Sequence, residues 1–194
     1  MKRRLSVLSL LLLLPLGACG YNRIQSLDEA AASAQGQIEN QLQRRAELIP
    51  NLVNTVKGYA QHEQEVFENV AKARSGLLGA VQQKDPEAEA TANAQMTTAL
   101  GRLLVVAENY PQLKADQGFL KLQDELTGTE NRIAVSRTDY NNAVNSYNAY
   151  IRQFPAVVTA KVSGAKPRKY FQASASAEGG PPTVDFSKPP AKTP

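Results

Sequence analysis

A long apolar repeat runs through the first half of the chain. Between Ala31 and Val81, apolar side chains recur at alternating steps of three and four residues. This spacing places them along one face of a helix and is typical of helices that pack lengthwise against each other. The repeat consists of Ala31, Ala34, Ile38, Leu42, Ile49, Val53, Val56, Ala60, Phe67, Val70, Leu77 and Val81. The sequence therefore predicts one very long helix, or two, and an all-α fold.

Two local signals set the expected limits of this first helical stretch. Ser26 and Glu29 have the spacing of a capping box, which predicts a helix start near Leu27. Pro50 removes a backbone donor and clashes with the preceding turn, so we expect a kink or short break at residues 48–51.

Two further helices follow. Asp85 and Pro86 supply an N-cap and a first-turn proline for a helix that extends to about residue 109. Asp116 can cap a third helix, which Pro155 closes. Connections this short make neighbouring helices antiparallel. We predict an elongated antiparallel up-down bundle of three to four long helices over residues 27–160.

The first residues have the layout of a secretory signal. A basic start, Lys2 to Arg4, precedes an apolar run from Leu5 to Leu16. A permanent membrane span needs roughly 20 apolar residues, so this run is too short. It ends at Leu16-Gly17-Ala18-Cys19, which resembles a bacterial lipobox, whose cysteine receives diacylglycerol and then a further acyl chain such as palmitate. We predict a signal peptide at residues 1–18, a lipid on Cys19 and a linker up to residue 26.

The lipid explains why the chain has a single cysteine. A lone exported thiol is otherwise a liability, and two or three acyl chains make membrane attachment stable. The alternative is an ordinary signal cleaved elsewhere, with Cys19 as a small apolar residue inside it. Gly20 after the cysteine is similar to the pattern sorted to the Gram-negative outer membrane, which favours a periplasmic position.

The charge balance argues against nucleic acid as a partner. The chain has 22 basic and 18 acidic residues, but three of the basic ones lie in the signal, which leaves a net charge of +1. Residues 161–194 carry +4 of this charge, so residues 19–160 carry −3. Phosphate binding needs a clustered basic face, which the bundle lacks. The basic end of the chain can at most touch anionic lipid head groups weakly.

Residues 161–194 read as a flexible tail. From about Ser163 the sequence is rich in Ala, Ser, Gly and Pro, a composition that buries too little apolar area to fold by itself. Phe171, Val184 and Phe186 are the side chains in it that can dock on the bundle.

Several sequence blocks resemble the LemA family. In the first helical stretch these are Tyr21-Asn22, Gln41-Leu42-Gln43-Arg44-Arg45-Ala46-Glu47-Leu48-Ile49-Pro50-Asn51-Leu52-Val53 and Val56-Lys57-Gly58-Tyr59-Ala60-Gln61-His62-Glu63. Later blocks are Glu130-Asn131-Arg132-Ile133, Arg137, Tyr140-Asn141, Tyr147-Asn148 and Phe154-Pro155. The resemblance implies a membrane-attached helical bundle outside the cytoplasm, with no established enzymatic activity or cofactor. Members typically carry an N-terminal transmembrane helix, from which the lipobox departs.

Six charged residues fall in the apolar phase of the predicted helices. They are Arg45, Glu63, Arg74, Glu89, Glu130 and Arg137. Long side chains can lie along such a seam with their charges in water. The alternative is a buried ion-pair network that fixes the alignment of the helices. Counting along an unbroken first helix pairs Arg74 with Glu130 and places Arg137 near Glu89.

The same counting leaves one apolar stripe without a cover. A second helix starting at residue 85 reaches back only to about residue 60 of the first helix. The predicted interaction stripe consists of Ile38, Leu42, Ile49 and Val53. Its cover can be the end of the third helix, a fold-back at Pro50, a second copy of the chain or another protein.

The search for catalytic chemistry gives one weak candidate. His62, the only histidine, has the carboxylates of Glu63 and Glu65 nearby in sequence, which is at most half of a metal site. Tyr140 and Tyr147 read as core aromatics with hydroxyls bound at the rim. Our first hypothesis is a lipid-anchored interaction or scaffold protein, without enzymatic activity, cofactor or small-molecule substrate, that binds an envelope protein or itself. The alternative is an envelope enzyme or metal-dependent catalyst using His62 and nearby carboxylates.

Overall fold

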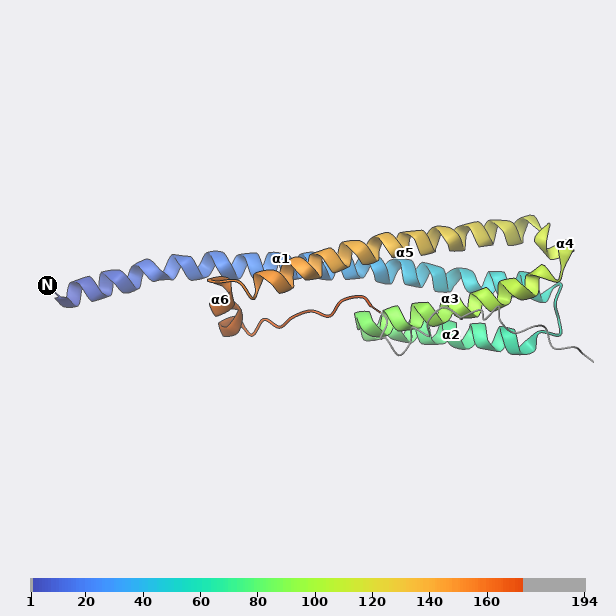
Figure 1. Ribbon diagram of the computed structural model, residues 1–194, viewed down its shortest axis with the longest axis horizontal. Coiled ribbons are helices and arrows are strands. Elements are labelled where there is room, and N and C mark those ends of the chain that lie inside the picture. Colours follow the sequence, from blue (N-terminus) through green and yellow to red (C-terminus); the bar gives the residue numbers. More distant parts are fainter. Residues whose placement is uncertain (1, 173–194) are drawn as a thin grey trace, which may run out of the picture.

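The fold is an elongated bundle of α-helices, seen in a computed structural model that describes the backbone of residues 2–172 and the side chains of residues 20–172 (Figure 1). The helices are α1 (Lys2–Lys57), α2 (Gln64–Gln83), α3 (Pro86–Glu108), α4 (Pro111–Lys114), α5 (Gln117–Tyr150) and α6 (Ala156–Ser163). No strand occurs in the part of the chain that is described. The predicted all-α antiparallel architecture is confirmed.

Two long helices form the frame of the bundle. α1 and α5 lie side by side in antiparallel directions, and α2 and α3 form a hairpin against one half of this pair (Figure 1). The short α4 connects α3 to α5 at the end of the bundle that carries the hairpin, and α6 packs on α1 towards the opposite end. We call residues 31–144 the distal part, and residues 20–30 with 145–172 the proximal part.

The cap residues position the helices as the sequence predicts. Asp85 accepts a hydrogen bond from the Glu87 backbone N–H at 3.4 Å, and Pro86 opens α3. Asp116 accepts from the Phe119 backbone N–H at 2.8 Å and starts α5. These side chains satisfy N–H groups that have no partner inside their own helix.

The first helical stretch breaks at a different point from the one predicted. α1 passes through Pro50 without interruption, and the chain reverses instead at residues 58–63. The predicted helix start near Leu27 is also wrong, because α1 is already helical from Lys2 and residues 19–26 belong to it rather than to a linker. No proline interrupts residues 20–25, so the helix continues through Gly20, and Ile24 is buried there.

The early reversal folds α2 and α3 back over the distal half of α1. The predicted interaction stripe is therefore wrong, because Ile38, Leu42 and Ile49 are buried inside the chain's own core, with Val53 half-buried beside them. The physical reason is that the chain covers the stripe itself: α5, the predicted third helix, makes most of the contact with α1, and α2 packs beside it.

The chain after α5 is ordered further than its composition suggests. α6 ends at Gly164, whose positive φ of 73° is the usual helix stop, and an extended segment then follows the bundle up to Gln172 (Figure 1). Phe171 docks in the distal core and is 3% exposed. The tail boundary predicted at residue 161 is thus too early. Val184 and Phe186 lie outside the described residues, as does the remainder of the predicted flexible tail.

Candidate functional site

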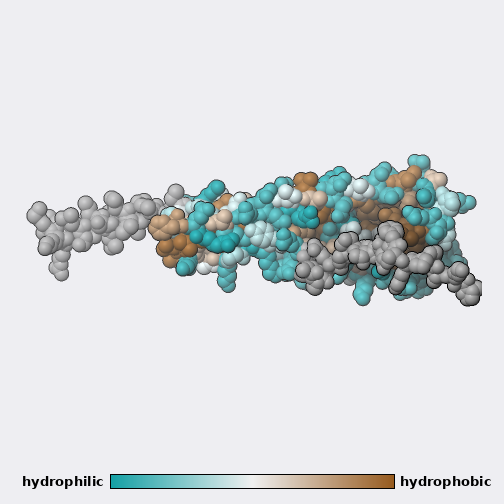
Figure 2. Space-filling model, viewed as in Figure 1, coloured by the Kyte–Doolittle hydropathy of each residue, from teal (hydrophilic) through white to brown (hydrophobic). Residues whose placement is uncertain are grey.

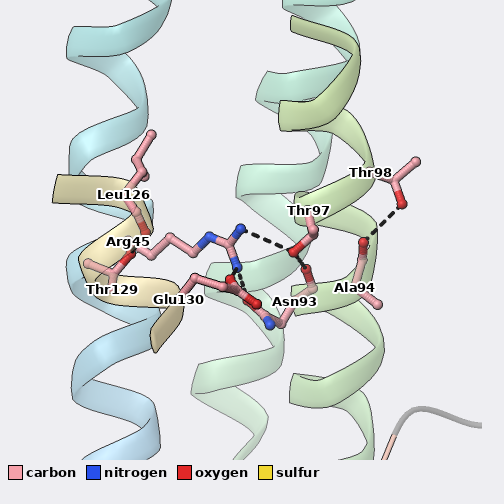
Figure 3. A network of polar contacts seen from close by, with 8 residues as sticks. All are labelled: Arg45, Asn93, Ala94, Thr97, Thr98, Leu126, Thr129 and Glu130. Carbon is pink, nitrogen blue, oxygen red and sulfur yellow. Dashed lines mark hydrogen bonds and ion pairs between the residues drawn. The ribbon is translucent and has the colours of Figure 1, made fainter. Parts of the chain in front are cut away.

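A buried arginine connects three helices near the middle of the distal part (Figure 3). Arg45 on α1 is 4% exposed, and its Nη1 donates to Asn93 Oδ1 on α3 at 2.6 Å. The same atom forms an ion pair with Glu130 on α5, and Nη2 donates to Thr97 Oγ1 at 3.1 Å. A single guanidinium therefore binds α3 and α5 at once.

Burial and pairing have opposite effects on the charge of Arg45. Burial lowers the pKa of Arg45, and the charge of Glu130 counters that shift. The Arg45 Nε atom is buried and has no hydrogen-bond partner among the described residues. Thr97 in turn donates to the backbone carbonyl of Asn93 at 3.1 Å, which orients the polar face of α3. A guanidinium held this way suits a structural role, since its charge is already neutralised.

The pairing predicted between Arg74 and Glu130 is wrong. Because the chain reverses at residues 58–63, α5 runs antiparallel to α1, and Glu130 meets Arg45 instead. Arg137 is exposed rather than joined to Glu89, and Glu63 is half-buried in the connection before α2. Of the six predicted network residues, the structure joins Arg45 and Glu130 directly.

Arg74 has a different role, which explains how α1 continues through Pro50. A proline at position 50 cannot donate to the carbonyl of Ala46, so that acceptor loses its helical partner. Arg74 Nε on α2 donates to this carbonyl oxygen at 2.8 Å. The orphaned acceptor is therefore satisfied from a neighbouring helix, and the helix needs no break.

Glu89 is a buried acid at the start of α3. It is fully buried, and neither carboxylate oxygen has a hydrogen-bond partner in the described structure. Burial raises the pKa of Glu89 to about 7, the charge of Glu39 adds to this rise, and the nearby Gln35 amide partly counters it. Glu89 can thus hold a proton near neutral pH, although none of the grooves described below includes it.

A repeated Tyr-Asn pair on α5 holds the extended segment after α6. Asn148 accepts from the Arg168 backbone N–H at 2.8 Å and donates to the carbonyl of the same residue at 2.9 Å. Asn141 likewise accepts from the Phe171 backbone N–H at 2.9 Å and donates to the Phe171 carbonyl at 3.5 Å. Asn141 and Asn148 are seven residues apart on α5, which corresponds to a rise of about 10.5 Å. The three residues from 168 to 171 in the extended segment span about 10 Å, so each asparagine lies opposite one of these two backbone positions.

Other contacts complete this attachment. The Tyr140 hydroxyl donates to the Lys169 carbonyl at 2.8 Å, and burial raises the pKa of Tyr140 to about 12. Arg168 pairs with Asp28 on α1 at 2.7 Å, and Lys169 pairs with Asp85 at 3.1 Å. Tyr140 and Tyr147 are both buried, as predicted. The Tyr-Asn repeat is visible in the sequence, but its seven-residue spacing alone does not identify the backbone groups that it binds.

Two grooves run along the distal part. One of about 650 Å³ lies between α1 and α2, with Ile49, Val53 and Phe67 in its wall. The other, of about 930 Å³, is mostly polar and lies between α3 and α5, with Glu130 and Arg137 in its wall. His62 is exposed in the connection between α1 and α2. Within residues 20–172, no three His, Cys, Asp or Glu side chains are grouped to hold a metal ion.

These helices and their polar core define an elongated, antiparallel α-helical bundle. The family model described as LemA family matches residues 34–186, and the chain belongs to this family. The resemblance found in the sequence blocks is therefore confirmed. In the described part of the chain, no helix combines the length and apolar character that crossing a membrane requires.

Three relatives are similar to large parts of the chain. Magnetosome protein MamQ 2 of Paramagnetospirillum magneticum is 28% identical over 191 residues, which covers 87% of this chain and 70% of the relative. Magnetosome protein MamQ of Magnetospirillum gryphiswaldense is 27% identical over 190 residues, covering 86% and 70%. Protein LemA of Metamycoplasma hominis is 26% identical over 133 residues, covering 69% and 57%. None of these three names states an enzymatic activity.

Proposed function

We propose that this protein is a lipid-anchored, non-enzymatic helical module of the cell envelope, which presents a binding groove away from the membrane surface. The lipid is carried by Cys19 and places the bundle on the periplasmic face. The similarity to two proteins named magnetosome proteins supports an association with membranes.

The observation that carries this proposal is the continuity of α1. The helix includes Cys19 and extends without a break to Lys57. From residue 20 to residue 57, an α-helix rises about 56 Å. A lipid on Cys19 therefore places one end of this rigid helix at the bilayer, and the far end of the bundle reaches at most roughly that distance from it.

The groove between α1 and α2 is the surface that we assign to a partner. Its wall combines the apolar Val53 and Phe67 with charged residues, namely Lys57, Glu68 and Arg74. An apolar floor with charges of both signs suits an amphipathic helix, either of another envelope protein or of a second copy. This groove shares Ile49 and Val53 with the predicted stripe, whereas Ile38 and Leu42 are buried and do not line it.

Changing the acceptor cysteine tests the anchor. Full-length protein with its own signal is expressed in a Gram-negative host and labelled with a palmitate analogue. The wild type is expected to carry label and to sediment with membranes. Cys19→Ala is expected to lose the label and to leave the membrane fraction, whereas Ser26→Ala keeps both. Membrane attachment that survives Cys19→Ala without any label contradicts the lipid anchor.

Site-specific crosslinking in cells tests the groove. A photo-crosslinking residue at Asn54 or Gln64, both exposed in the groove wall, is expected to give one discrete product. The matched control places the same residue at Val135, which is 63% exposed on α5 and lies outside this groove. A product with twice the mass of the chain identifies self-association. The same products from the control position, or no product from either groove position, overturn the assignment.

A further inference from the structure

Exposed apolar side chains gather at the proximal end of the bundle. Phe154 is 85% exposed, Val162 is 86% exposed and Val158 is 56% exposed, with Tyr21 nearby on α1. We call these four residues the α6 patch. Figure 2 shows brown, apolar surface at this end of the bundle. Exposed large apolar residues elsewhere in the described chain are scattered over the other helices and connections.

The patch is held in place by the opposite face of α6. Ala156 and Ala160, four residues apart, are buried. Val158 and Val162 are displaced by two residues from these alanines, which places them on the outer face of the helix. Ala160 packs with Ile24 of α1, with Tyr147 of α5 and with Ile151, which directly follows α5. The outer apolar face is thus presented by a fixed element rather than by a loose end.

The patch lies beside the residue that carries the proposed anchor. Gly20 approaches α6 so closely that a Cβ atom on it would lie 3.3 Å from Thr159 Oγ1. Cys19 immediately precedes Gly20 in the same helix. A lipid on Cys19 would therefore bring the surface of the bilayer to the level of α6.

The charges around the patch are mostly positive. Arg23, Arg152, Lys161 and Lys166 are exposed around it, whereas Glu29 is the exposed acid at this level of α1. Asp28, the other nearby acid, is paired with Arg168. Apolar and aromatic side chains with basic neighbours form the pattern that sits at the interface of an anionic bilayer.

We propose that the α6 patch docks on anionic phospholipid and holds the bundle against the membrane as a second contact beside the lipid. This inference rests on the anchor proposed for Cys19, which supplies the proximity. Phe154, Val158 and Val162 enter the head-group region, while Lys161 and Lys166 bind lipid phosphates. The docked end fixes the direction in which α1 projects, which a flexible acyl linkage alone cannot do. A protein partner on the same patch is the competing occupant.

A fluorophore on the patch tests the docking. The full-length acylated protein carries its lipid on Cys19, so an added cysteine is the free thiol for an environment-sensitive dye. Val162→Cys reports on the patch, and Val135→Cys, at a position that is 63% exposed on the distal part of α5, is the control. Each protein is reconstituted into vesicles of phosphatidylethanolamine and phosphatidylglycerol. Docking is expected to blue-shift the dye at position 162 and to let nitroxide-labelled lipid quench it, with neither change at position 135.

The outcomes separate this inference from the anchor. Protein that floats with the vesicles while both dyes remain in water keeps the anchor and overturns the docking. Protein that does not float contradicts the anchor itself. Shielding at position 162 that occurs in native membranes but not in pure lipid vesicles assigns the patch to a protein partner and overturns lipid docking.

Charge variants test the lipid specificity. Lys161→Gln with Lys166→Gln is expected to lower the ratio of docked to undocked protein by roughly fivefold for each lysine, which is the usual contribution of a basic residue near an anionic surface. Lys114→Gln with Lys121→Gln, two exposed lysines at the distal end, is the control and should change nothing. The electrostatic part of the proposal is overturned if Lys161→Gln with Lys166→Gln leaves docking unchanged and the wild type docks equally well on vesicles of phosphatidylcholine alone.

Discussion

The distal and proximal parts of the bundle are held together by different forces. The distal part contains a continuous apolar core to which α1, α2, α3, α4 and α5 all contribute. The proximal part has a small cluster of four buried residues, Ile24, Tyr147, Ile151 and Ala160. Leu27, Tyr150 and Ala165 pack against this cluster, and Phe171 reaches into the distal core. Polar contacts add to these, such as the pair of Asp28 and Arg168 and the bonds of Asn148.

This difference indicates where each kind of mutation acts. Apolar burial provides most of the free energy of folding, so the distal part sets global stability. Segments with few buried apolar contacts open locally, at a lower free energy than the whole fold. We expect the proximal part to be such a segment when the protein is free of membrane. Four predictions test this contrast, from the largest effect to the smallest.

The largest effect is expected at the Arg45 ion pair in the distal part. Glu130→Ala leaves the buried guanidinium of Arg45 without its counter-ion, and Arg45→Ala removes its bonds to Asn93 and Thr97. Breaking a fully buried pair costs about 3 to 5 kcal/mol of unfolding free energy. The Glu130 side chain is 45% exposed, so water screens part of the interaction, and each change is expected to cost up to this amount in a denaturant titration.

The neighbouring Arg44 provides the control for this prediction. It is exposed on the same turn of α1, so Arg44→Ala should change stability by less than about 0.5 kcal/mol. The double variant of Arg45 and Glu130 should be much less destabilised than the sum of the single variants. Additive losses contradict direct coupling of the pair.

The second effect concerns the buried acid Glu89 and depends on pH. Its pKa is about 7 in the folded protein, compared with an ordinary value of 4.5. Between these values the folded state keeps a proton that the unfolded state has lost. Stability is therefore expected to fall as pH rises from about 4.5 to 7, by about 3 kcal/mol, and then to level off.

Glu89→Gln is expected to remove this pH dependence. The variant should be the more stable protein at pH 8, by up to the same roughly 3 kcal/mol, because glutamine has no charge to bury. Asp124→Asn, at an exposed position on α5, should leave the pH profile of the wild type unchanged. Parallel profiles for wild type and Glu89→Gln show that Glu89 is not the titrating group.

Signals between residues close in sequence predicted the helices. Features that depend on contacts with distant residues were not predicted. Asp85 and Asp116 act through groups within three residues, so their caps were correctly predicted. The effect of Pro50 depends on Arg74, which is 28 residues from the Ala46 carbonyl that it binds. No pattern near Pro50 contains that information, and so the break was placed at the wrong position.

The reversal of the chain at residues 58–63 was not predicted. This single difference changed both the predicted ion pair and the predicted interaction stripe. An unbroken first helix sets Glu130 level with Arg74, whereas a chain that turns back at residues 58–63 sets it level with Arg45. The residues of the network could be recognised by their position in the apolar phase. Their pairing could not, because it depends on the direction of each helix. The segment after α6 was missed for a similar reason, since its backbone partners are side chains of α5.

The third prediction uses the link between Arg74 and Pro50. Arg74→Ala removes the donor to the Ala46 carbonyl and is expected to cost about 1.5 to 3 kcal/mol of unfolding free energy. In a Pro50→Ala background, the new backbone N–H can bind that carbonyl, so the same change should cost less than half as much. Thermal or denaturant unfolding of the four proteins gives the coupling energy. If Arg74→Ala costs the same unfolding free energy in both backgrounds, the bond from Arg74 does not compensate for Pro50.

The smallest effect is expected in the proximal part, at Asn148. Asn148→Ala removes both hydrogen bonds to the backbone of Arg168, and each such bond contributes about 1 kcal/mol. Because few apolar contacts hold this segment, the loss should appear as local opening. Amide hydrogen exchange of Arg168 should accelerate by roughly tenfold or more, while the slowest amides of the distal core change far less. Asn142→Ala, at an exposed position on the same helix, is the matched control. If exchange in the distal core accelerates as much as exchange at Arg168, then the two parts unfold as one unit, and the polar contacts of the proximal part contribute to global stability.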